Sequence, residues 1–524
     1  LPASFQAMDA TRLARRWDRA DLAQQTFELL NARRRLDDQV NWDPADATQL
    51  WRFHLHYWEW AWSLAADGGP QARATFARLH ADWTRATTFG RWDAWAPYPA
   101  SLRAWVLVNV HHDLAAGTDL DGPLTDDIAL HGGFLAHNLE LDVGGNHLVK
   151  NIKALVGCAV FLHDDGLLDP ALRHLDRELA VQVLPDGGHY ELSPSYHCQV
   201  LADLVDVAGL LAAAERPPVP ALDDAVARMR TWLGELIQPD GALPLLNDAE
   251  PVDPALLARL EPVAARPRPL TVLPDSGYAV VRSGPFHLVA DVGQPGPPSP
   301  PGHIHADCLS FTLHVHGRPA VVDTGTSEYG SGPRRAHERS TAAHNTVEID
   351  GTDQTEVFGA FRAGRRARTT LERAEVRPDG TITLTASHDG YRHLPGRPVH
   401  RRTWTVTPDT VVVRDQVDGT GVHDLAARLH LPVDHADRPD QPDPGSEPTP
   451  VGPVVIRSEA GSGARHPVVT IDACLLARGF GHLVPGSTHT SRTRTQLPTV
   501  LTTTLGAHPQ EPRPRADREP DTPR

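Results

Sequence analysis

The chain has 524 residues, 40% of them hydrophobic and 22% charged, which is an ordinary composition for a globular protein with two or three cores. Its formal net charge of −16 argues against a general nucleic-acid-binding protein, and its four cysteines lack the spacing of a disulfide framework or a thiolate metal site. The longest apolar run, ALVGCAVFL, is too short to cross a bilayer, so we predict no membrane insertion.

The first half of the chain is predicted to be helical. Residues 1–47 are expected to form a helical extension. From 48 to 265 apolar residues recur at three- and four-residue spacing, as in HLVKNIKALVGCAVFL. Breaks rich in Gly, Pro and Asp separate these segments, which is typical of successive helix hairpins. Ten of the twelve tryptophans precede residue 106, either as helical core or as aromatic platforms for sugar rings.

A Pro-rich join at 261–277 is followed by a change of period. From 275 to 506 short runs alternate apolar and polar residues, as in LSFTLHVHG and RTWTVTPDTVVVRDQVDG, between Gly, Pro, Asn and Asp breaks. No helical pattern interrupts these runs, so an antiparallel sandwich or barrel is expected rather than parallel βαβ units. Residues 507–524 have the composition of a disordered tail. The predicted fold class is therefore α+β, with a helical domain followed by an all-β domain.

Two clusters of polar and aromatic residues interrupt the helical half. VGGNHLVKNIKAL places Asn146, His147 and Lys150 along about one helical face after a pair of glycines. PDGGHYELSPSYHCQV brings Glu191 and Tyr196 close together at a Gly-rich turn. Asn146 is also a good helix cap, and the second stretch also fits a turn with a buried tyrosine. Composition leaves both interpretations open.

A histidine-rich segment lies in the β half. In PGHIHADCLSFTLHVHGRPAVVDTG, His303 and His305 are two residues apart, so on a strand both point to one side. Asp323 ends this stretch, and His344 lies in RSTAAHNTVEIDG just before another strand. Imidazoles and a carboxylate from adjacent strands make a sound tetrahedral zinc set with one position left for water. With 29 histidines in the chain, coincidental pairs are common, so composition alone leaves a zinc site open.

Together these stretches resemble the heparinase II/III polysaccharide lyases, and most closely the heparinase III side of that family. LWRFHLHYWEW, GGNHLVKNIKAL, DGGHYELSPSYH and the histidine segment up to RSTAAHNTVEIDG occur in the family's order. The resemblance implies an N-terminal incomplete α/α toroid followed by a C-terminal antiparallel β-sandwich, with the active site in a cleft between them. It also implies β-elimination at a uronic acid within a polysaccharide, which leaves an unsaturated uronate at the new chain end.

The resemblance implies catalytic roles for four residues. Asn146 matches the asparagine that neutralises the substrate carboxylate, and His147 lies beside it. Tyr196, in SPSYH, matches the catalytic tyrosine. His303 matches the second catalytic position, which is a base for the other C5 epimer or a carboxylate contact.

Other residues are expected to surround the tyrosine or the substrate. A phenol has an ordinary pKa near 10, so a phenolate base needs a cationic surround, for which Lys150, Lys153 and Arg339 are the candidates. Lys150 and Arg339, together with Glu191 and Tyr329, are the expected substrate contacts. Many members carry an aromatic residue immediately before RST, where this chain has RRAHERST, and Tyr329 is the candidate to replace it.

The resemblance also concerns the cofactor and the substrate. His305, Asp323 and His344 match metal positions of several members, where zinc holds loops of the β domain. Zinc is therefore expected to be structural or supportive, and the elimination itself to require no cofactor. The expected substrate is an acidic polysaccharide of heparan-sulfate, heparosan or bacterial exopolysaccharide type. The net charge of −16 favours the less sulfated of these.

Two other functions stay open. A zinc hydrolase would use metal-bound water and leave no new double bond, and a non-catalytic glycan-binding protein would keep the fold without the chemistry. The presence of Asn146, Tyr196 and His303 argues against the second. Family members that act on external glycans are exported, which favours a secreted or cell-surface protein. The first residues, LPASFQAMDA, lack the basic start and apolar core of a secretory signal, so the compartment stays open.

Overall fold

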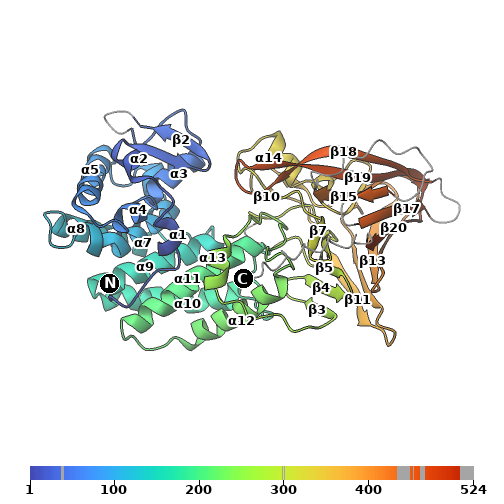
Figure 1. Ribbon diagram of the computed structural model, residues 1–524, viewed down its shortest axis with the longest axis horizontal. Helices are drawn as coiled ribbons and strands as arrows, with labels where there is room; N and C mark the ends of the chain where they lie inside the picture. The colour runs from blue at the N-terminus through green and yellow to red at the C-terminus, as the bar shows by residue number, and fades with distance from the viewer. Residues whose placement is uncertain are drawn as a thin grey trace, which may run out of the picture.

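The computed structural model describes residues 1–36, 41–297, 299, 301–432, 449–451, 454–460 and 466–507. Its long helices lie in the first half of the chain and its long strands in the second, so the molecule has a helical half and a β half (Figure 1). The fold is a mixture of helices and antiparallel sheets, as the change in sequence period predicted. The tail expected at 507–524 lies outside the described residues, apart from Ala507.

The helical half is a succession of helices joined by short loops. Their bounds are α3 (Gln49–Tyr57), α4 (Ala61–Ala65), α5 (Pro70–Ala86), α6 (Trp92–Trp95), α7 (Pro97–Leu114), α8 (Asp121–His137), α9 (Gly145–Leu162), α10 (Asp165–Gln182), α11 (Pro194–Ala213), α12 (Pro220–Leu236) and α13 (Pro254–Arg259). Buried residues cover most of α7, α9 and α11, which form the centre of this half. The tryptophan side chains described before residue 106 belong to the core, so packing is their role.

The first 47 residues differ from the expected helical extension. Two short helices are followed by an antiparallel hairpin, and the elements are α1 (Ala10–Leu13), α2 (Arg19–Ala23), β1 (Thr26–Leu29) and β2 (Ala32–Arg35). The hairpin forms because Leu30 and Asn31 both take positive φ, the backbone of a two-residue turn between twisted strands. The helical prediction was wrong here because Leu-Asn is not the Asn-Gly turn signal and each strand has only four residues.

Antiparallel sheets make up the β half. The sheet β3-β4-β5-β6-β7 consists of Leu270–Leu273, Tyr278–Ser283, Phe286–Asp291, Phe311–Val315 and Arg318–Val321. The sheet β11-β12-β13-β14-β20-β17-β16 consists of Thr369–Val376, Ile382–His388, Val399–Val406, Thr410–Asp418, Thr499–Ala507, Val454–Ala460 and Thr449–Val451. The sheet β18-β19-β15-β8 consists of Val468–Ala477, Leu483–Gln496, Val422–Pro432 and Val347–Ile349. Buried apolar residues of all three sheets share one large core, and a second, smaller core lies around β8 and the start of β15.

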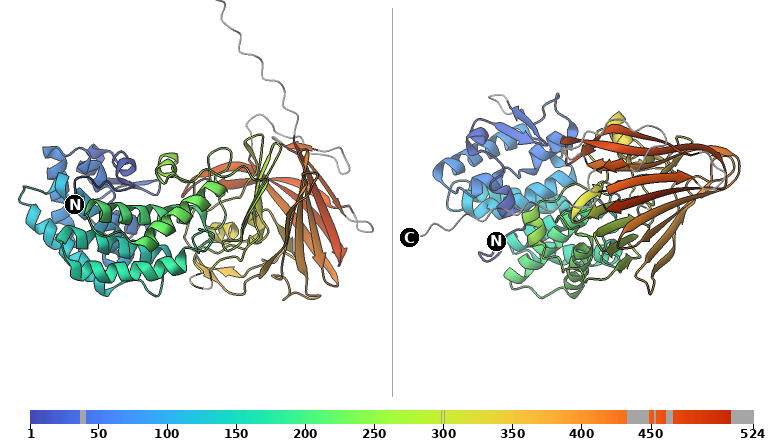
Figure 2. Two further views of the ribbon diagram at one scale, coloured as in Figure 1. Left: turned by 90° about the horizontal axis from the view of Figure 1, so that it is seen from below. Right: turned by 45° about the vertical axis from the view of Figure 1, so that its right-hand side comes forward.

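The connection between β7 and β11 carries short elements of its own. They are α14 (Pro333–Glu338), the 3-10 helix η1 (Thr341–Ala343), and the strand pair β9 (Val357–Phe358) and β10 (Arg362–Ala363). In Figure 1 α14 and β10 lie on the side of the β half that faces the helices, and in the left view of Figure 2 yellow segments again lie between the green helices and the orange strands. The hydrogen bond of Tyr329 with Tyr196 places this connection next to the first turn of α11.

The helical half and the β half meet beside the start of α11. Tyr278 Oη on β4 donates a hydrogen bond of 2.5 Å to the carbonyl of Leu192, and Trp232 Nε1 on α12 donates one of 2.8 Å to Ser276 Oγ. All these groups are buried, so the contacts fix the first turn of α11 against the sheet β3-β4-β5-β6-β7.

Helix α11 is both long and apolar. By length and composition alone it is the one helix among the described residues that could cross a membrane, and 61% of its most apolar window is buried inside the protein. It packs against α9 and α12 within the helical half.

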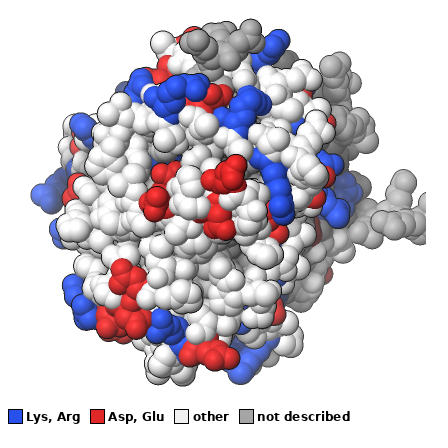
Figure 3. All heavy atoms as spheres, turned by 90° about the vertical axis from the view of Figure 1, so that its left-hand side faces the viewer, with Lys and Arg blue, Asp and Glu red and all other residues white. Residues whose placement is uncertain are grey.

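Charges of both signs are mixed on the end face of the helical half. Figure 3 shows acidic and basic side chains interspersed there among a larger area of other residues. This face therefore presents no broad basic surface to a polyanion.

Candidate active site

The glycine pair at the start of α9 lets Asn146 approach Glu191. Gly144 and Gly145 have φ of +66° and +57°, and a Cβ on Gly145 would lie 2.0 Å from Glu191 Oε1. Asn146 Nδ2 donates to both carboxylate oxygens of Glu191, at 3.2 and 3.1 Å. Both residues are buried, Asn146 at 2% and Glu191 at 4% exposure, so Glu191 positions Asn146. The expected contact of Glu191 with the substrate stays a prediction.

His147 is the accessible neighbour of Asn146. Its side chain is 38% exposed, and its Nδ1 lies 3.2 Å from Glu140 Oε1. Its ring lies against that of Tyr98, with 4.1 Å between the ring centroids. These two contacts orient the imidazole and leave Nε2 as the ring nitrogen that a ligand can reach.

Tyr196, in the first turn of α11, meets two residues of the β half. Its Oη lies 2.8 Å from Tyr329 Oη, and its ring centroid lies 3.9 Å from that of His303. Tyr329 comes from the loop after β7 and His303 from the loop after β5. All three residues are partly exposed, so an approaching ligand can reach them. The structure thus places the expected second phenol against the first.

Burial controls the protonation of the tyrosine. It raises the pKa of Tyr196 well above its usual range, and the Asp248 carboxylate adds to this effect. The hydrogen bond with Tyr329 acts in the opposite direction without reversing it. The expected cationic surround is therefore not what determines the state of the phenol, which stays protonated at neutral pH.

The two lysines of the chain belong to a buried ion-pair cluster instead. Lys150 Nζ donates to Asp203 Oδ1 at 2.7 Å, and Lys153 Nζ donates to Asp203 Oδ1 at 2.9 Å and to Asp206 Oδ2 at 2.5 Å. Asp206 also accepts a hydrogen bond of 2.7 Å from the backbone N of Met8. The lysines therefore stabilise the N-terminal segment on α9 and α11. Their ammonium groups are thus paired with aspartates, and the expected surround of the phenol and contact of Lys150 with the substrate stay predictions.

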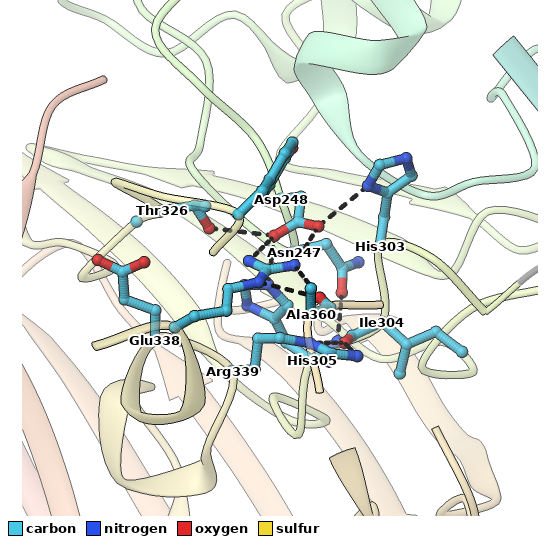
Figure 4. Close-up of polar contacts among 12 residues, drawn as sticks. Asn247, Asp248, His303, Ile304, His305, Thr326, Glu338, Arg339 and Ala360 are labelled. Atoms are coloured by element: carbon cyan, nitrogen blue, oxygen red, sulfur yellow. Dashed lines mark hydrogen bonds and ion pairs between the residues drawn. The ribbon is translucent and has the colours of Figure 1, made fainter. Parts of the chain in front are cut away.

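Asp248 is the centre of the polar contacts on the β side of Tyr196 (Figure 4). It is fully buried and accepts hydrogen bonds from His303 Nδ1 at 3.0 Å, His305 Nε2 at 2.8 Å and Thr326 Oγ1 at 3.2 Å. Both terminal nitrogens of Arg335 donate to its two oxygens, one of them at 2.7 Å. Burial alone would raise the pKa of Asp248, but Arg335 and the histidines hold it well below its usual range.

Arg335, rather than Arg339, is the arginine beside the phenols. Its guanidinium carbon lies 4.9 Å from the ring centroid of Tyr329. Arg339 is 1% exposed and donates only to backbone carbonyls, among them those of Ile304 at 3.1 and 2.9 Å and Gly359 at 3.2 Å. Backbone carbonyls thus satisfy the guanidinium of Arg339, and its expected contact with the substrate stays a prediction.

A buried group of metal-ligating atoms lies next to Asp248. His305, Asp307 and His344 each offer one ligand atom, all within 4.8 Å of one another. Among the described residues, His305 Nδ1 and His344 Nε2 are buried and have no hydrogen-bond partner, and the buried oxygens of Asp307 have none from a side chain. The remaining ring nitrogens face carboxylates, since His305 Nε2 contacts Asp248 and His344 Nδ1 lies 2.8 Å from Asp323 Oδ2. Two imidazoles oriented by carboxylates, together with a third carboxylate, fit a zinc ion.

Asp323 differs from its expected place as a third ligand. Its Oδ2 accepts the hydrogen bond from His344 Nδ1, and its Oδ1 accepts one of 3.0 Å from Gly325 N, so both oxygens are engaged. Asp307 takes its place in the group. Asp307 was not among the residues predicted to bind the metal, although HIHAD repeats the two-residue spacing of the histidines.

The two imidazoles of this group differ in protonation. Burial lowers the pKa of His305 to about 4, so this residue is neutral. Burial also acts to lower the pKa of His344, but the carboxylates of Asp323 and Asp307 outweigh it and raise the pKa to about 9. A cation at this position would replace the proton of His344.

Comparison with known sequences identifies one family over most of the chain. The heparinase II/III N-terminus matches residues 6–265, and the heparinase II/III-like C-terminal region matches residues 265–466. FtsZ-localized protein C of Caulobacter vibrioides is 30% identical over 372 residues, which are 67% of this chain and 62% of that protein. The heparin-sulfate lyase of Bacteroides stercoris is 22% identical over 327 residues, 55% of this chain and 46% of that protein. The chain thus spans less than two thirds of the length of these curated relatives.

Solved structures agree on the fold. A crystal structure of heparinase III has a TM-score of 0.80 at 16% identity, covering 97% of this chain and 86% of that chain. The heparan sulfate lyase HepC from Pedobacter heparinus has a TM-score of 0.62 at 17% identity, covering 97% and 84%. The chondroitin AC lyase of Streptomyces coelicolor A3 has a TM-score of 0.59 at 10% identity, covering 95% and 79%. Because both family regions match in order along this fold, the chain belongs to the heparinase II/III family.

Proposed function

We propose that this protein is a polysaccharide lyase that cleaves a uronic-acid-containing glycan by β-elimination. The observation that carries the proposal is the contact of Tyr196 with Tyr329 and His303, in a chain of the heparinase II/III family. In this proposal the helical half is an incomplete α/α toroid and the β half an antiparallel β-sandwich. The glycan lies between them, because residues of both halves form the site.

The reaction requires a neutralised carboxylate, a base and an acid. At the start of α9, the half-exposed imidazole of His147 would neutralise the uronate carboxylate, and Asn146 would join it once its side-chain amide leaves Glu191. His303 would take the C5 proton through Nε2, because its Nδ1 is held by Asp248. The electrons then form the C4–C5 double bond while the bond from C4 to the glycosidic oxygen breaks. Tyr196, protonated because burial raises its pKa, would give its proton to that oxygen.

Zinc is proposed to support this site. His305 Nδ1, His344 Nε2 and an oxygen of Asp307 would hold it. When bound, zinc would supply a fixed cross-link between the loops that carry these residues. Asp248 contacts both His305 and His303, so one carboxylate would orient a metal ligand and the proposed base together.

A weakly sulfated glycan fits the charges of the site best. Arg335 is paired with a carboxylate, Arg339 with carbonyls, and Lys150 and Lys153 with aspartates. These four cations therefore offer little attraction to sulfate groups, and the net charge of −16 adds a long-range repulsion. We propose a heparosan-like or bacterial exopolysaccharide substrate on this ground.

The proposal is tested by the formation of an unsaturated uronate. The protein is incubated with heparosan, heparan sulfate, hyaluronan, alginate and bacterial exopolysaccharides, and the ultraviolet absorbance of the conjugated double bond is followed. Tyr196→Phe is expected to lower turnover about 100- to 10,000-fold with little change in KM, the range for a general acid. Tyr391→Phe is the matched control, since its hydroxyl donates to the carbonyl of Val347 within the β core. Shorter products without absorbance would contradict the elimination and favour a hydrolase.

The relative with 30% identity favours a second candidate function. FtsZ-localized protein C is named for its location with FtsZ, and this chain matches 62% of its length. We propose that this chain too acts where FtsZ assembles, which is compatible with lyase activity. The test is a fluorescent fusion of the full chain imaged in dividing bacteria together with FtsZ. A signal at the division site supports the proposal, and a signal spread evenly through the cell contradicts it.

A further inference from the structure

The tip of the β9-β10 hairpin carries two exposed phenylalanines. Phe358 ends β9 and is 47% exposed, and Phe361 lies directly before β10 and is 42% exposed. Phe89 is the only other phenylalanine among the described residues with an exposed side chain. Single apolar residues on a surface need no explanation, but two phenyl rings in water on one short hairpin indicate a surface that a ligand covers.

Two buried arginines hold the backbone of this tip in place. Arg339 donates to the carbonyls of Phe358 and Gly359 at 3.4 and 3.2 Å, and Arg335 donates to the carbonyl of Ala360 at 3.1 and 3.0 Å (Figure 4). The two guanidinium groups are 1% and 0% exposed, and burial lowers the pKa of Arg339 to about 10. Since burying a cation is unfavourable unless it is hydrogen-bonded, these contacts fix both the arginines and the hairpin tip.

The fixed tip lies against the tyrosine pair. The ring of Phe361 packs edge-on against Tyr329, with 5.1 Å between the centroids, and the guanidinium carbon of Arg335 lies over the Phe361 ring at 5.7 Å. Tyr329 Oη in turn lies 2.8 Å from Tyr196 Oη. Only Tyr329 therefore separates an exposed phenyl ring from the proposed acid, on the side of the β half that faces the helices (Figure 1).

We propose that Phe361, together with Phe358 on the same tip, is an aromatic subsite that stacks on an uncharged sugar ring beside the uronate. This inference rests on the proposed lyase function and deepens it. The face of a phenyl ring carries partial negative charge, so it attracts the C–H groups of a pyranose and repels a carboxylate. Covering the two rings also removes apolar surface from water. Phe361 is thus a specificity-determining residue that favours glycans in which uronates alternate with neutral sugars.

Calorimetric titration of oligosaccharides into the Tyr196→Phe variant tests the subsite without catalysis. The probes are hexasaccharides of heparosan and hyaluronan, in which uronates alternate with N-acetylglucosamine, and of alginate, in which every unit is a uronate. Phe361→Ala removes the ring and Phe361→Trp replaces it with another aromatic one. Phe89→Ala is the matched control, because it removes an exposed phenyl ring that packs on Trp95 and Phe134 in the helical half.

The expected loss of affinity depends on the sugar. Phe361→Ala should weaken binding of the heparosan or hyaluronan hexasaccharide about 5- to 15-fold and that of alginate less than about twofold, since a partly exposed phenyl ring no longer buries a neutral sugar. Phe361→Trp should bind within about threefold of the unaltered residue, and Phe89→Ala should bind unchanged. Equal weakening for all three glycans would overturn the preference for a neutral sugar.

Two other results would overturn the subsite itself. One is binding of none of the three hexasaccharides, and the other is an affinity that Phe361→Ala leaves unchanged. If that affinity is unchanged and a fluorescent fusion of Phe361→Ala leaves the division site, the two rings serve a protein partner instead.

A parallel assay of the chain with Tyr196 intact for unsaturated uronate separates this inference from the proposed function. Binding that depends on Phe361 without unsaturated product would refute the elimination and retain the subsite. Formation of unsaturated product with unchanged affinity in Phe361→Ala would refute the subsite and retain the elimination.

Discussion

Removing the charge of Asp248 is expected to destabilise the β half strongly. Asp248→Asn keeps the shape of the side chain but leaves the Arg335 guanidinium, which is 0% exposed, without its carboxylate. The amide would also direct an N–H group toward donors of Arg335, His303 or His305, which now donate to the two oxygens. Leaving one partner of a buried ion pair unpaired costs about 3–5 kcal/mol, so a loss of about 4 kcal/mol is expected.

The measurement is urea unfolding of Asp248→Asn at neutral pH, followed by circular dichroism in the β region. Asp424→Asn is the matched control, because Asp424 pairs with Arg494 on the surface of the same half, where the expected loss is below about 1 kcal/mol. The double variant Asp248→Asn/Arg335→Met removes the unpaired charge and is expected to be more stable than Asp248→Asn alone. A loss for Asp248→Asn no larger than that of the surface control would refute the reasoning.

Three further outcomes are expected. Gly145→Ala, which brings a Cβ to 2.0 Å from Glu191 Oε1, should lower the free energy of unfolding by about 1–3 kcal/mol and raise KM. An unchanged urea midpoint of unfolding together with an unchanged KM would contradict this. Asp323→Asn should weaken zinc binding about 10- to 100-fold in a competition assay with a chelating dye, whereas His344→Ala should abolish it at unchanged circular dichroism. The zinc affinity of the unaltered protein should rise with pH up to about 9, because the pKa of His344 is raised to about 9 and this residue must lose its proton before it can bind the metal. A zinc affinity that stays constant between pH about 6 and about 9 would contradict this.

The division into a helical and a β half could be predicted because each pattern is local. Apolar residues at helical spacing continue to α13, which ends at Arg259, and alternation begins with β3 at Leu270. The β1-β2 hairpin could not be predicted in this way. Leu30-Asn31 carries no turn signal, and the hairpin contacts α3 and the β18-β19 turn, partners that a local pattern does not reveal.

The residues of the candidate site show the same difference between local sequence patterns and tertiary contacts. His303, His305 and His344 could be recognised from spacing and from the resemblance to a family, since each lies in a short recognisable stretch. Asp248 lies 55 residues from His303 and 87 from Arg335, in a loop whose sequence NDAE carries no motif. Its importance follows only from the folded contacts.

The lysines and arginines show what the sequence alone leaves out about substrate contacts. An arginine or lysine in a sequence shows its charge but not the partner that already neutralises it. Lys150 was expected to face the substrate, yet Asp203, 53 residues away on α11, holds its ammonium group. Arg339 is satisfied in the same manner by carbonyls of the loop at Ile304 and of the β9-β10 hairpin.

The central claim is that Tyr196 and His303 carry out an elimination, and product mass tests it most directly. A uronate-containing oligosaccharide of one defined length is digested to completion with the purified protein, and the fragments are weighed by mass spectrometry. Elimination predicts two fragments whose masses add up to that of the substrate, because no water is consumed, and predicts that Tyr196→Phe leaves the substrate uncut. Fragments that together exceed the substrate by one water molecule would contradict the account and identify a hydrolase.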